Sequence, residues 1–367
     1  MVTAWRDGSD GVHMDRALAL ARRGRGQTSP NPMVGAVVVS GAGAVVGSGF
    51  HARAGAAHAE VCALDEAGPA ARGATLYSTL EPCSHHGRTG PCVARISEAG
   101  VRRVVVAVGD PSPKVNGAGI AWLRQRGIQV DVGVRRAEAA RLNEVFLTWA
   151  ALGRPFVTMK IATSRDNRIA SDRGVRTQIT GAASAAAVHA TRAEVDAVGV
   201  GSTTVLVDDP LLTARGARRR LPLTRVVFDR RLRTPPTAKM FGTLEAGPIV
   251  IMTTAAALRS QEPAADRLWA AGAAIQPLET GAMDEVMQRL GASEITSLLL
   301  EGGTAVHRAA WSAGVVDRVQ RYIAPVCLGA RGVPWVDDGL SVARLRDARV
   351  RQLGADMLLE GHVQRLD

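Results

Sequence analysis

The stretch TLYSTLEPCSHHGRTGPC, residues 75–92, joins an apolar run to two cysteines and decides the fold of the first half of the chain. Together with Ala74, its beginning predicts a strand from Ala74 to Leu80 that ends at Glu81-Pro82. Cys83 then opens a loop, and Cys92 is expected to begin a helix. The two thiols therefore stand at the two ends of one strand-to-helix connection.

An imidazole and a carboxylate stand upstream in His58-Ala59-Glu60, where another helix is expected to begin. His58, Cys83 and Cys92 suit zinc (Zn2+), because one imidazole and two thiolates leave a fourth tetrahedral position for water. Zinc makes hydroxide available near neutral pH. Glu60 can move a proton without joining the metal shell, as in the His-x-Glu…Pro-Cys signature of zinc deaminases. A structural zinc site is the alternative, but it would need a fourth protein ligand.

Eight residues, Ser84 to Pro91, separate the cysteines, whereas the common deaminase pattern has two. The insert contains His85, His86 and Arg88, which suit contact with a phosphate or a pyrimidine edge. The two histidines are rival metal ligands, but adjacent residues on a tight loop seldom reach one ion. We interpret the insert as a substrate-contacting or structural loop.

Around this stretch, strands and helices alternate, which predicts layered α/β folds. In the first half we expect helices at 14–23, 58–66, 92–99, 120–126 and 135–150, a hairpin of 34–39 and 44–50, and strands at 104–108 and 128–132. After Gly153-Arg154-Pro155 a second series begins, with strands at 156–162, 197–201, 225–229, 248–252 and 297–300. The predicted domains are residues 1–152 and 153–367.

Composition is consistent with two globular domains, since 46% of the 367 residues are hydrophobic and 22% are charged. The net charge of +11 allows nucleic acid, a membrane surface or a small anionic substrate as partner. The arginines at 218–220, 230, 231 and 233 have no interleaved aromatic side chains, so we interpret them as a solvated loop and strand edge, and expect no nucleic-acid partner. No long uncharged apolar run is present, so we expect no membrane span and a cytoplasmic protein.

In the second half, Gly302-Gly303 follows a predicted strand and precedes a helix. Backbone amides at such a point can approach a phosphate, although a tight turn is the simpler alternative. No Gly-x-Gly-x-x-Gly motif follows a strand, so a Rossmann domain is not indicated.

Five stretches resemble the bifunctional riboflavin-biosynthesis deaminase–reductase family. They are NPMVG at 31–35, HAE at 58–60, TLEPCSHHGRT at 79–89, GSTTVLVDDPLLTAR at 201–215 and LLEGG at 299–303. Because these stretches lie in both halves, the resemblance covers nearly the whole chain. The resemblance implies a cytidine-deaminase-like three-layer α/β/α N-terminal domain and a dihydrofolate-reductase-like α/β C-terminal domain.

The resemblance further implies hydrolysis of the 2-amino group of a diaminopyrimidinone carrying a phosphoribosylamino group, followed by NADPH reduction of the ribose to ribityl. Its partner is then a small phosphorylated pyrimidine, and a homo-oligomer is left open. It places zinc on His58, Cys83 and Cys92 and proton transfer on Glu60. It assigns substrate contacts to Asn31, His51, His85, Arg88, Arg176, Arg192, Leu212, Arg215 and Glu301, and cofactor contacts to Ala162, Gln178, Thr204, Asp208 and Gly303.

The sequence departs from the family at Ala118, Arg165, Asn167, Arg176 and Gln178. Asn can adopt positive φ, so the turn at 167 is expected to survive the loss of the usual glycine. Two other functions are weighed against the family reading. One is a nucleic-acid base deaminase, and the other is a deaminase whose second domain binds a nucleotide without reducing anything.

Overall fold

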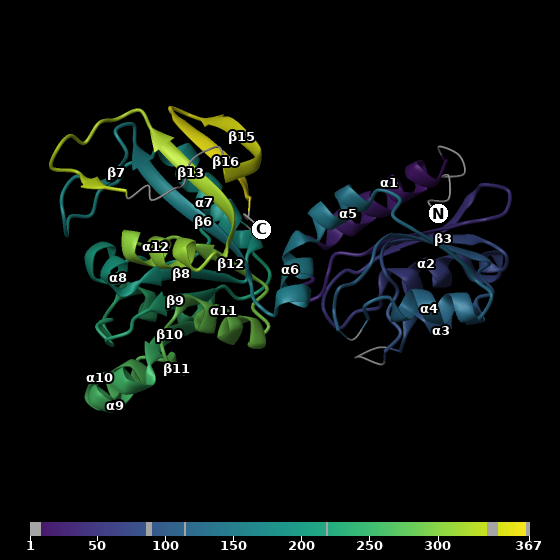
Figure 1. Ribbon diagram of the computed structural model, residues 1–367, viewed down its shortest axis with the longest axis horizontal. Coiled ribbons are helices and arrows are strands. Elements are labelled where there is room, and N and C mark those ends of the chain that lie inside the picture. The colour runs from purple at the N-terminus through teal and green to yellow at the C-terminus, as the bar shows by residue number, and fades with distance from the viewer. Residues whose placement is uncertain (1–8, 86–89, 114, 218, 336–343, 365–367) are drawn as a thin grey trace. The chain divides into compact units, whose positions relative to one another are not determined.

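The computed structural model describes residues 9–85, 90–113, 115–217, 219–335 and 344–364. The chain divides between Gly153 and Arg154 into two compact units, each built on its own sheet (Figure 1). Within the described ranges, no helix combines the length and apolar character needed to cross a bilayer.

The first unit contains a five-stranded sheet in the order β2-β1-β3-β4-β5. Its strands are β1 Gly35–Val39, β2 Val45–Phe50, β3 Thr75–Leu80, β4 Arg103–Val108 and β5 Gln129–Val132. β1 and β2 form the predicted antiparallel hairpin, in which Gly35 pairs with Phe50. β3, β4 and β5 run parallel, so their carboxyl ends meet at one edge.

Helices cover both faces of this sheet. The helices are α1 Ser9–Ala21, α2 Ala59–Ala67, α3 Cys92–Glu98, α4 Ala118–Gln125, α5 Arg136–Leu142 and α6 Glu144–Leu152, with short 3-10 turns η1 Arg22–Gly24 and η2 Gly68–Ala71. One apolar core packs Leu18 of α1 and Ala139 of α5 against the sheet. A separate core packs Leu64 of α2, Ile96 of α3 and Leu123 of α4. Two cores on opposite faces make three layers, which confirms the α/β/α prediction.

Close packing of α2 on β2 sets the position of the residues at the start of α2. A Cβ added at Gly47 or Gly49 of β2 would collide with the backbone of α2 at Ala63 or Ala59. Only glycine permits this approach, which brings the N-terminal turn of α2 against the sheet edge.

The predicted helix at 135–150 is interrupted at Asn143. The Asn143 side chain accepts a hydrogen bond from the Met33 backbone N–H at 2.9 Å and donates one to the Met33 carbonyl at 2.8 Å. The side chain therefore ties the junction of α5 and α6 to the segment before β1. Met33 and Asn143 are 110 residues apart in the sequence, so helix periodicity could not reveal their contact.

The second unit contains a nine-stranded sheet in the order β11-β10-β9-β8-β12-β6-β13-β16-β15. The strands are β6 Phe156–Ser164, β8 Ala197–Gly201, β9 Thr224–Phe228, β10 Ile249–Thr254, β11 Ala273–Leu278, β12 Ser297–Leu300, β13 Val316–Ala324, β15 Leu345–Leu353 and β16 Asp356–Val363, and β7 Arg168–Ala170 pairs separately with β14 Val333–Pro334. From β11 to β13 the strands are parallel, and β16 and β15 add an antiparallel edge.

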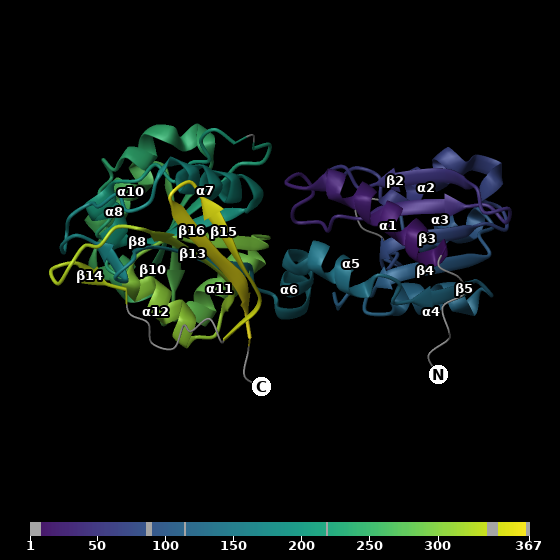
Figure 2. The same cartoon turned by 90° about the horizontal axis from the view of Figure 1, so that it is seen from above.

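Helices of this unit also lie on both faces of the sheet (Figure 2). They are α7 Ala182–Glu194, α8 Ser202–Asp208, α9 Ala255–Ser260, α10 Glu262–Ala270, α11 Met283–Ala292 and α12 Thr304–Ser312, with the 3-10 segment η3 Lys239–Ala246. Val205 of α8 and Leu268 of α10 share one apolar core, whereas Leu290 of α11 and Ala310 of α12 share another. The helices after the adjacent strands β8 and β12 thus leave on opposite faces. Ligands of open α/β sheets bind at such a switch point, outside the carboxyl ends of the strands.

Candidate active site

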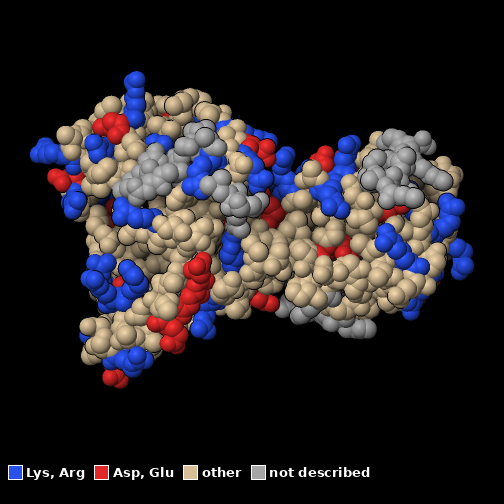
Figure 3. Space-filling view, viewed as in Figure 1, with Lys and Arg blue, Asp and Glu red and all other residues tan. Residues whose placement is uncertain are grey.

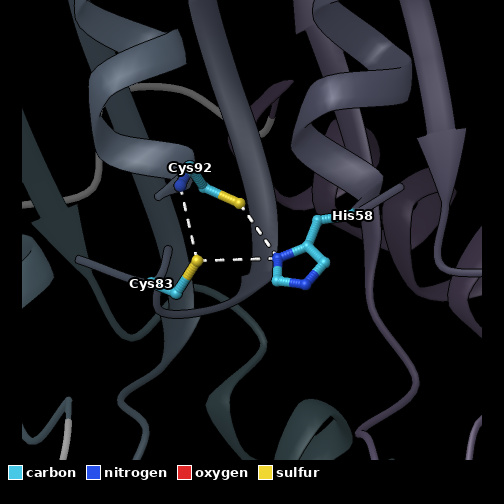
Figure 4. Close-up of side chains that lie close together, drawn as sticks. All are labelled: His58, Cys83 and Cys92. Atoms are coloured by element: carbon cyan, nitrogen blue, oxygen red, sulfur yellow. Dashed lines mark hydrogen bonds between the residues drawn. The ribbon is translucent and has the colours of Figure 1, made fainter. Parts of the chain in front are cut away.

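Three potential metal ligands converge at the edge of the first sheet. His58 caps the N-terminus of α2, Cys83 follows β3, and Cys92 is the first residue of α3. His58 Nδ1 lies 3.1 Å from Cys92 Sγ and 3.5 Å from Cys83 Sγ (Figure 4). All three ligand atoms lie within 4.8 Å of one another, and no other His, Cys, Asp or Glu of the described ranges joins the group. This donor set fits zinc with one position left for water.

Electrostatics around the Cys83 thiol favour metal ligation. The Cys92 thiol and the His58 imidazole lower the pKa of Cys83, which favours its thiolate. The backbone N–H of Cys92, at the start of α3, also donates to Cys83 Sγ at 3.4 Å. A helix N-terminus stabilises negative charge, so the fold prepares Cys83 as an anionic ligand.

Glu60 is the second residue of α2, and its side chain is buried, with 3% of the residue exposed. Its Oε2 is 3.7 Å from Cys92 Sγ, and its Oε1 accepts a hydrogen bond from Ser78 Oγ at 3.1 Å. Burial raises the pKa of Glu60, which suits a carboxyl group that gives and takes protons near neutral pH. Ser78 was not predicted as a site residue, because a serine inside a strand has no sequence signature of its own.

Asn31 and His51 form a second polar pair beside the ligands. Asn31 Nδ2 lies 3.0 Å from His51 Nε2, and His51 Nδ1 lies 3.1 Å from the Ala57 carbonyl. The carbonyl can only accept, so Nδ1 carries the proton and Nε2 accepts from the Asn31 amide. The His51 and His58 rings meet edge to face at 5.5 Å. His85 is exposed, and Arg88 lies outside the described residues.

Glu81, which the sequence analysis did not single out, holds the segment that follows β4. Its buried carboxylate accepts backbone hydrogen bonds from Asp110, Gly117, Gly119 and Ile120, at 3.3, 3.1, 3.0 and 3.2 Å. Four donors on one carboxylate fix the N-terminal turn of α4 beside Pro82-Cys83. The sequence signal was present in the Glu-Pro-Cys run, but the donors are backbone groups that leave no trace in sequence.

In the second unit, Arg192 of α7 and Glu301 after β12 form a two-point ion pair. Burial opposes ionisation of Glu301, but the charge and hydrogen bonds of Arg192, together with the charges of Lys160 and His189, outweigh burial and lower the pKa of that carboxyl. Arg192 therefore lies in a buried pair rather than on a solvated helix face. Its Nη1 also donates to the Thr213 carbonyl at 2.9 Å.

Residues 212–215, here called the strap, carry two predicted substrate residues. Leu212 is buried with φ +55°, a left-handed conformation unusual for leucine, and Arg215 is exposed. Arg192, Glu301 and the strap are thus brought together by hydrogen bonds.

Two predicted cofactor residues, Thr204 and Gly303, lie close together at the switch point between β8 and β12. A Cβ at Gly302 would collide with Val200 of β8, so glycine is required there. Gly303 has φ +58°, and Thr204 Oγ1 lies 3.5 Å from where its Cβ would stand. The arrangement leaves a Gly-Gly turn at the start of α12 beside the first turn of α8, a cradle suited to phosphate groups.

The other predicted cofactor residues are less closely joined. Burial raises the pKa of Asp208, and the nearby charge of Arg176 acts in the opposite direction. Ala162 pairs with Tyr322 across β6 and β13. Gln178 is exposed between β7 and α7, and no hydrogen bond within the described ranges joins it to the rest of the set.

Lys160 of β6 is a charged residue that the sequence analysis passed over. Burial lowers the pKa of its ammonium group, and the charges of Glu301, Arg192 and Asp208 all act on it. Its Nζ lies 5.9 Å from the Tyr322 ring centre. Lysine on a central strand is the signal that was available, since such a strand is otherwise apolar.

Two arginines of the predicted solvated run have structural partners, which corrects that interpretation for them. Arg219 donates to the carbonyls of Arg192 and Val195 at 2.8 and 2.6 Å. Arg233 donates to Ser202 Oγ at 2.8 Å, at the start of α8. On the face shown in Figure 3, basic side chains form separate groups over both units.

Comparisons with known proteins match both units. The family profile described as the cytidine and deoxycytidylate deaminase zinc-binding region matches residues 8–108, and the one described as the RibD C-terminal domain matches residues 155–359. The riboflavin biosynthesis protein RibD of Aquifex aeolicus is 40% identical over 356 residues, which span 95% of this chain and 97% of that protein.

Solved structures show the same likeness in three dimensions. A structure of Acinetobacter baumannii RibD has a TM-score of 0.85 at 36% identity, and covers 97% of this chain and 99% of that one. The diaminohydroxyphosphoribosylaminopyrimidine deaminase/5-amino-6-(5-phosphoribosylamino)uracil reductase of Thermotoga maritima has a TM-score of 0.81 at 33% identity, with coverage of 97% and 99%.

Proposed function

Because this chain belongs to the RibD family of bifunctional deaminase–reductases of riboflavin biosynthesis, we propose that its two units act in sequence on one phosphorylated pyrimidine. The first unit hydrolyses the 2-amino group of 2,5-diamino-6-(5-phosphoribosylamino)pyrimidin-4-one. The second reduces the ribose to a ribityl chain with NADPH. The observation that carries the proposal is the convergence of His58, Cys83, Cys92 and buried Glu60 in a chain that matches the family across both units.

In the first unit, His58, Cys83 and Cys92 would hold zinc, which would lower the pKa of water toward neutrality. Glu60 Oε2 takes one proton from the attacking water and delivers it to the pyrimidine ring, then takes the second from the newly added hydroxyl and delivers it to the departing amine, while Ser78 fixes Oε1. The fixed tautomer of His51 turns the Asn31 amide so that its Oδ1 accepts from a pyrimidine amino group. His85 and Arg88 are proposed to contact the substrate from the insert.

In the second unit, NADPH supplies a hydride when bound, and Ala162, Gln178, Thr204, Asp208 and Gly303 are proposed to contact it. The Gly302-Gly303 turn and Thr204 support this placement, because they meet at the switch point. Arg176, Arg192, Leu212, Arg215 and Glu301 are proposed to contact the substrate. Arg215 is the exposed guanidinium of the strap, so we assign the phosphate to it, whereas Arg192 holds Glu301 and Thr213.

The departure at Asn167 is compatible with an active reductase. Asn167 has φ +61°, and its backbone N–H donates to the Ser164 carbonyl at 3.1 Å, so the turn is intact without glycine. Its Oδ1 accepts from Arg321 at 2.9 Å, a contact that glycine would lack. This favours a working second unit over one that only binds a nucleotide.

A substrate-side variant tests the reductase assignment. Supplied with the deaminated pyrimidine, Arg215→Ala is expected to raise KM for the pyrimidine about 10-fold or more, because a charge-assisted contact to phosphate is lost. KM for NADPH should stay the same. Equal effects on both constants would count against phosphate binding by Arg215.

A further inference from the structure

His189 of α7 contacts the strap at two backbone groups and has no role in the reaction described so far. Its Nδ1 lies 3.1 Å from the Thr213 carbonyl oxygen, and the Arg215 backbone N–H points to the same nitrogen at 3.2 Å. The imidazole is half-buried, one helical turn before Arg192 on the same helix. His189 and Arg192 therefore reach the strap side by side.

One nitrogen cannot donate to Thr213 and accept from Arg215 at the same time. The Thr213 carbonyl oxygen accepts from Arg192 Nη1 whichever tautomer His189 adopts, whereas the Arg215 N–H forms its hydrogen bond, within the described ranges, with His189 Nδ1 alone. Nδ1 is then the acceptor and Nε2 carries the proton. The charges around the ring agree with a neutral form: burial lowers the pKa of His189, as do Arg192 and Arg215, while Glu301 and the Thr213 carbonyl act in the opposite direction.

The strap needs such support because of its backbone. Leu212 holds φ +55°, and conformations of this kind persist only where the surroundings over-determine them. Arg192 fixes the Thr213 carbonyl, and His189 fixes the Arg215 N–H. The direction in which the exposed Arg215 side chain leaves the backbone follows from that bond.

We propose that His189 is a positioning residue of the reductase, whose Nδ1 holds the Arg215 backbone N–H and so sets the Arg215 guanidinium for the substrate phosphate. The inference rests on the phosphate role assigned to Arg215 in the proposed function. It predicts an effect on binding of the pyrimidine substrate, and none on NADPH or on hydride transfer.

The test measures KM for the deaminated pyrimidine, KM for NADPH and kcat separately, in zinc-loaded full-length enzyme. His189→Leu keeps the bulk and removes the acceptor, and is expected to raise the pyrimidine KM about 5- to 10-fold, as for one lost hydrogen bond. Its kcat and NADPH KM should remain within about twofold of wild type, since neither depends on the strap. His189→Gln, whose amide oxygen can accept, should restore most of the loss. His362→Gln, a histidine on β16 of the same unit, is the matched control.

A double variant shows whether His189 acts through Arg215. In an Arg215→Ala background, His189→Leu should add less than about twofold to KM, because coupled residues are non-additive. Lowering the pH should raise the wild-type pyrimidine KM, since protonated Nδ1 cannot accept, while His189→Gln should lack this dependence. Ammonia release reports whether each variant chain is folded and active in its first unit.

The two possible failures are distinguishable. If Arg215→Ala leaves the pyrimidine KM unchanged, the phosphate role in the proposed function fails. If Arg215→Ala raises KM but both His189 variants match wild type, the inference about His189 is overturned. It is also overturned if His189→Leu has its full effect in the Arg215→Ala background. A change in kcat or in KM for NADPH as large as the change in KM for the pyrimidine would overturn it as well.

Discussion

Arg192 Nε lies 2.6 Å from Glu301 Oε1, and Arg192 Nη2 lies 2.8 Å from Glu301 Oε2, so a two-point ion pair joins α7 to the end of β12. The side chains are only 12% and 7% exposed. Removing one partner of a buried pair leaves an uncompensated charge.

Arg192→Leu should therefore lower the free energy of unfolding of the second unit by about 3–5 kcal/mol. The double change Arg192→Leu with Glu301→Leu should lose less than the single one, because no buried charge is left alone. Calorimetry of the second unit's transition measures both. A single variant as stable as the wild type would show that the pair is solvated.

A second prediction concerns Asp10 at the start of α1. It accepts from Tyr77 at 2.6 Å and from both terminal nitrogens of Arg103 at 2.9 Å. Burial alone would raise the pKa of Asp10, but the bonds from Arg103 and Tyr77 outweigh burial and lower it. A carboxyl group whose pKa is lowered by folding stabilises the fold above its unfolded pKa, and this stabilisation is lost as pH falls through the folded value.

Asp10→Asn should thus cost about 2 kcal/mol near pH 6, and the difference from wild type should shrink below about pH 4. Asp15→Asn, on the same helix, is the matched control: its ion pair with Arg135 is exposed and should contribute far less to stability than the Asp10 bonds do. Chemical denaturation across this pH range is the measurement. A cost independent of pH would mean that the charge of Asp10 contributes nothing.

Glu60→Gln should reduce ammonia release by about 10²–10⁴-fold, because the amide cannot carry the proton. Zinc content should be unchanged, since Glu60 is outside the ligand group. Glu66→Gln is the control on the same helix, where Glu66 accepts hydrogen bonds from Ser48 at the surface. Wild-type ammonia release from Glu60→Gln would remove Glu60 from the mechanism.

We expect the reaction of the first unit to require zinc and the reaction of the second unit not to require it. Cys83→Ser should lose the one zinc expected per chain, measured by metal analysis, whereas Cys62→Ser should keep it because Cys62 is not in the ligand group. A chelator should stop ammonia release yet leave NADPH oxidation with the deaminated pyrimidine intact. Loss of both activities on chelation would place the metal in both reactions.

Prediction from sequence succeeded where the functional residues lie close together in the chain. The HAE and PCSHHGRTGPC runs gave the metal group, and Gly302-Gly303 gave the turn at the switch point, because these need particular residue types at fixed spacing. The strands β13, β15 and β16 were not predicted. β15 is exposed along nearly its whole length, so it has no alternating pattern to recognise.

Site residues were missed where their partners are distant or are backbone groups. Ser78 acts on Glu60 across a strand and a helix, and Glu81 binds four backbone amides. Arg192 and Glu301 were assigned to the site through the family resemblance, but they lie 109 residues apart, so only the fold reveals that they are paired. Such roles depend on tertiary contact rather than on residue type.

The most direct test of the central claim is a coupled assay of purified, zinc-loaded protein given the diaminopyrimidinone substrate and NADPH. Ammonia release and NADPH oxidation are followed separately, in wild type and in Glu60→Gln. The account predicts both signals from wild type; Glu60→Gln should show neither with this substrate, and NADPH oxidation should return when the deaminated pyrimidine is supplied. Ammonia release with no NADPH oxidation from wild type would contradict a working reductase, and no ammonia from the metal-loaded protein would contradict the account as a whole.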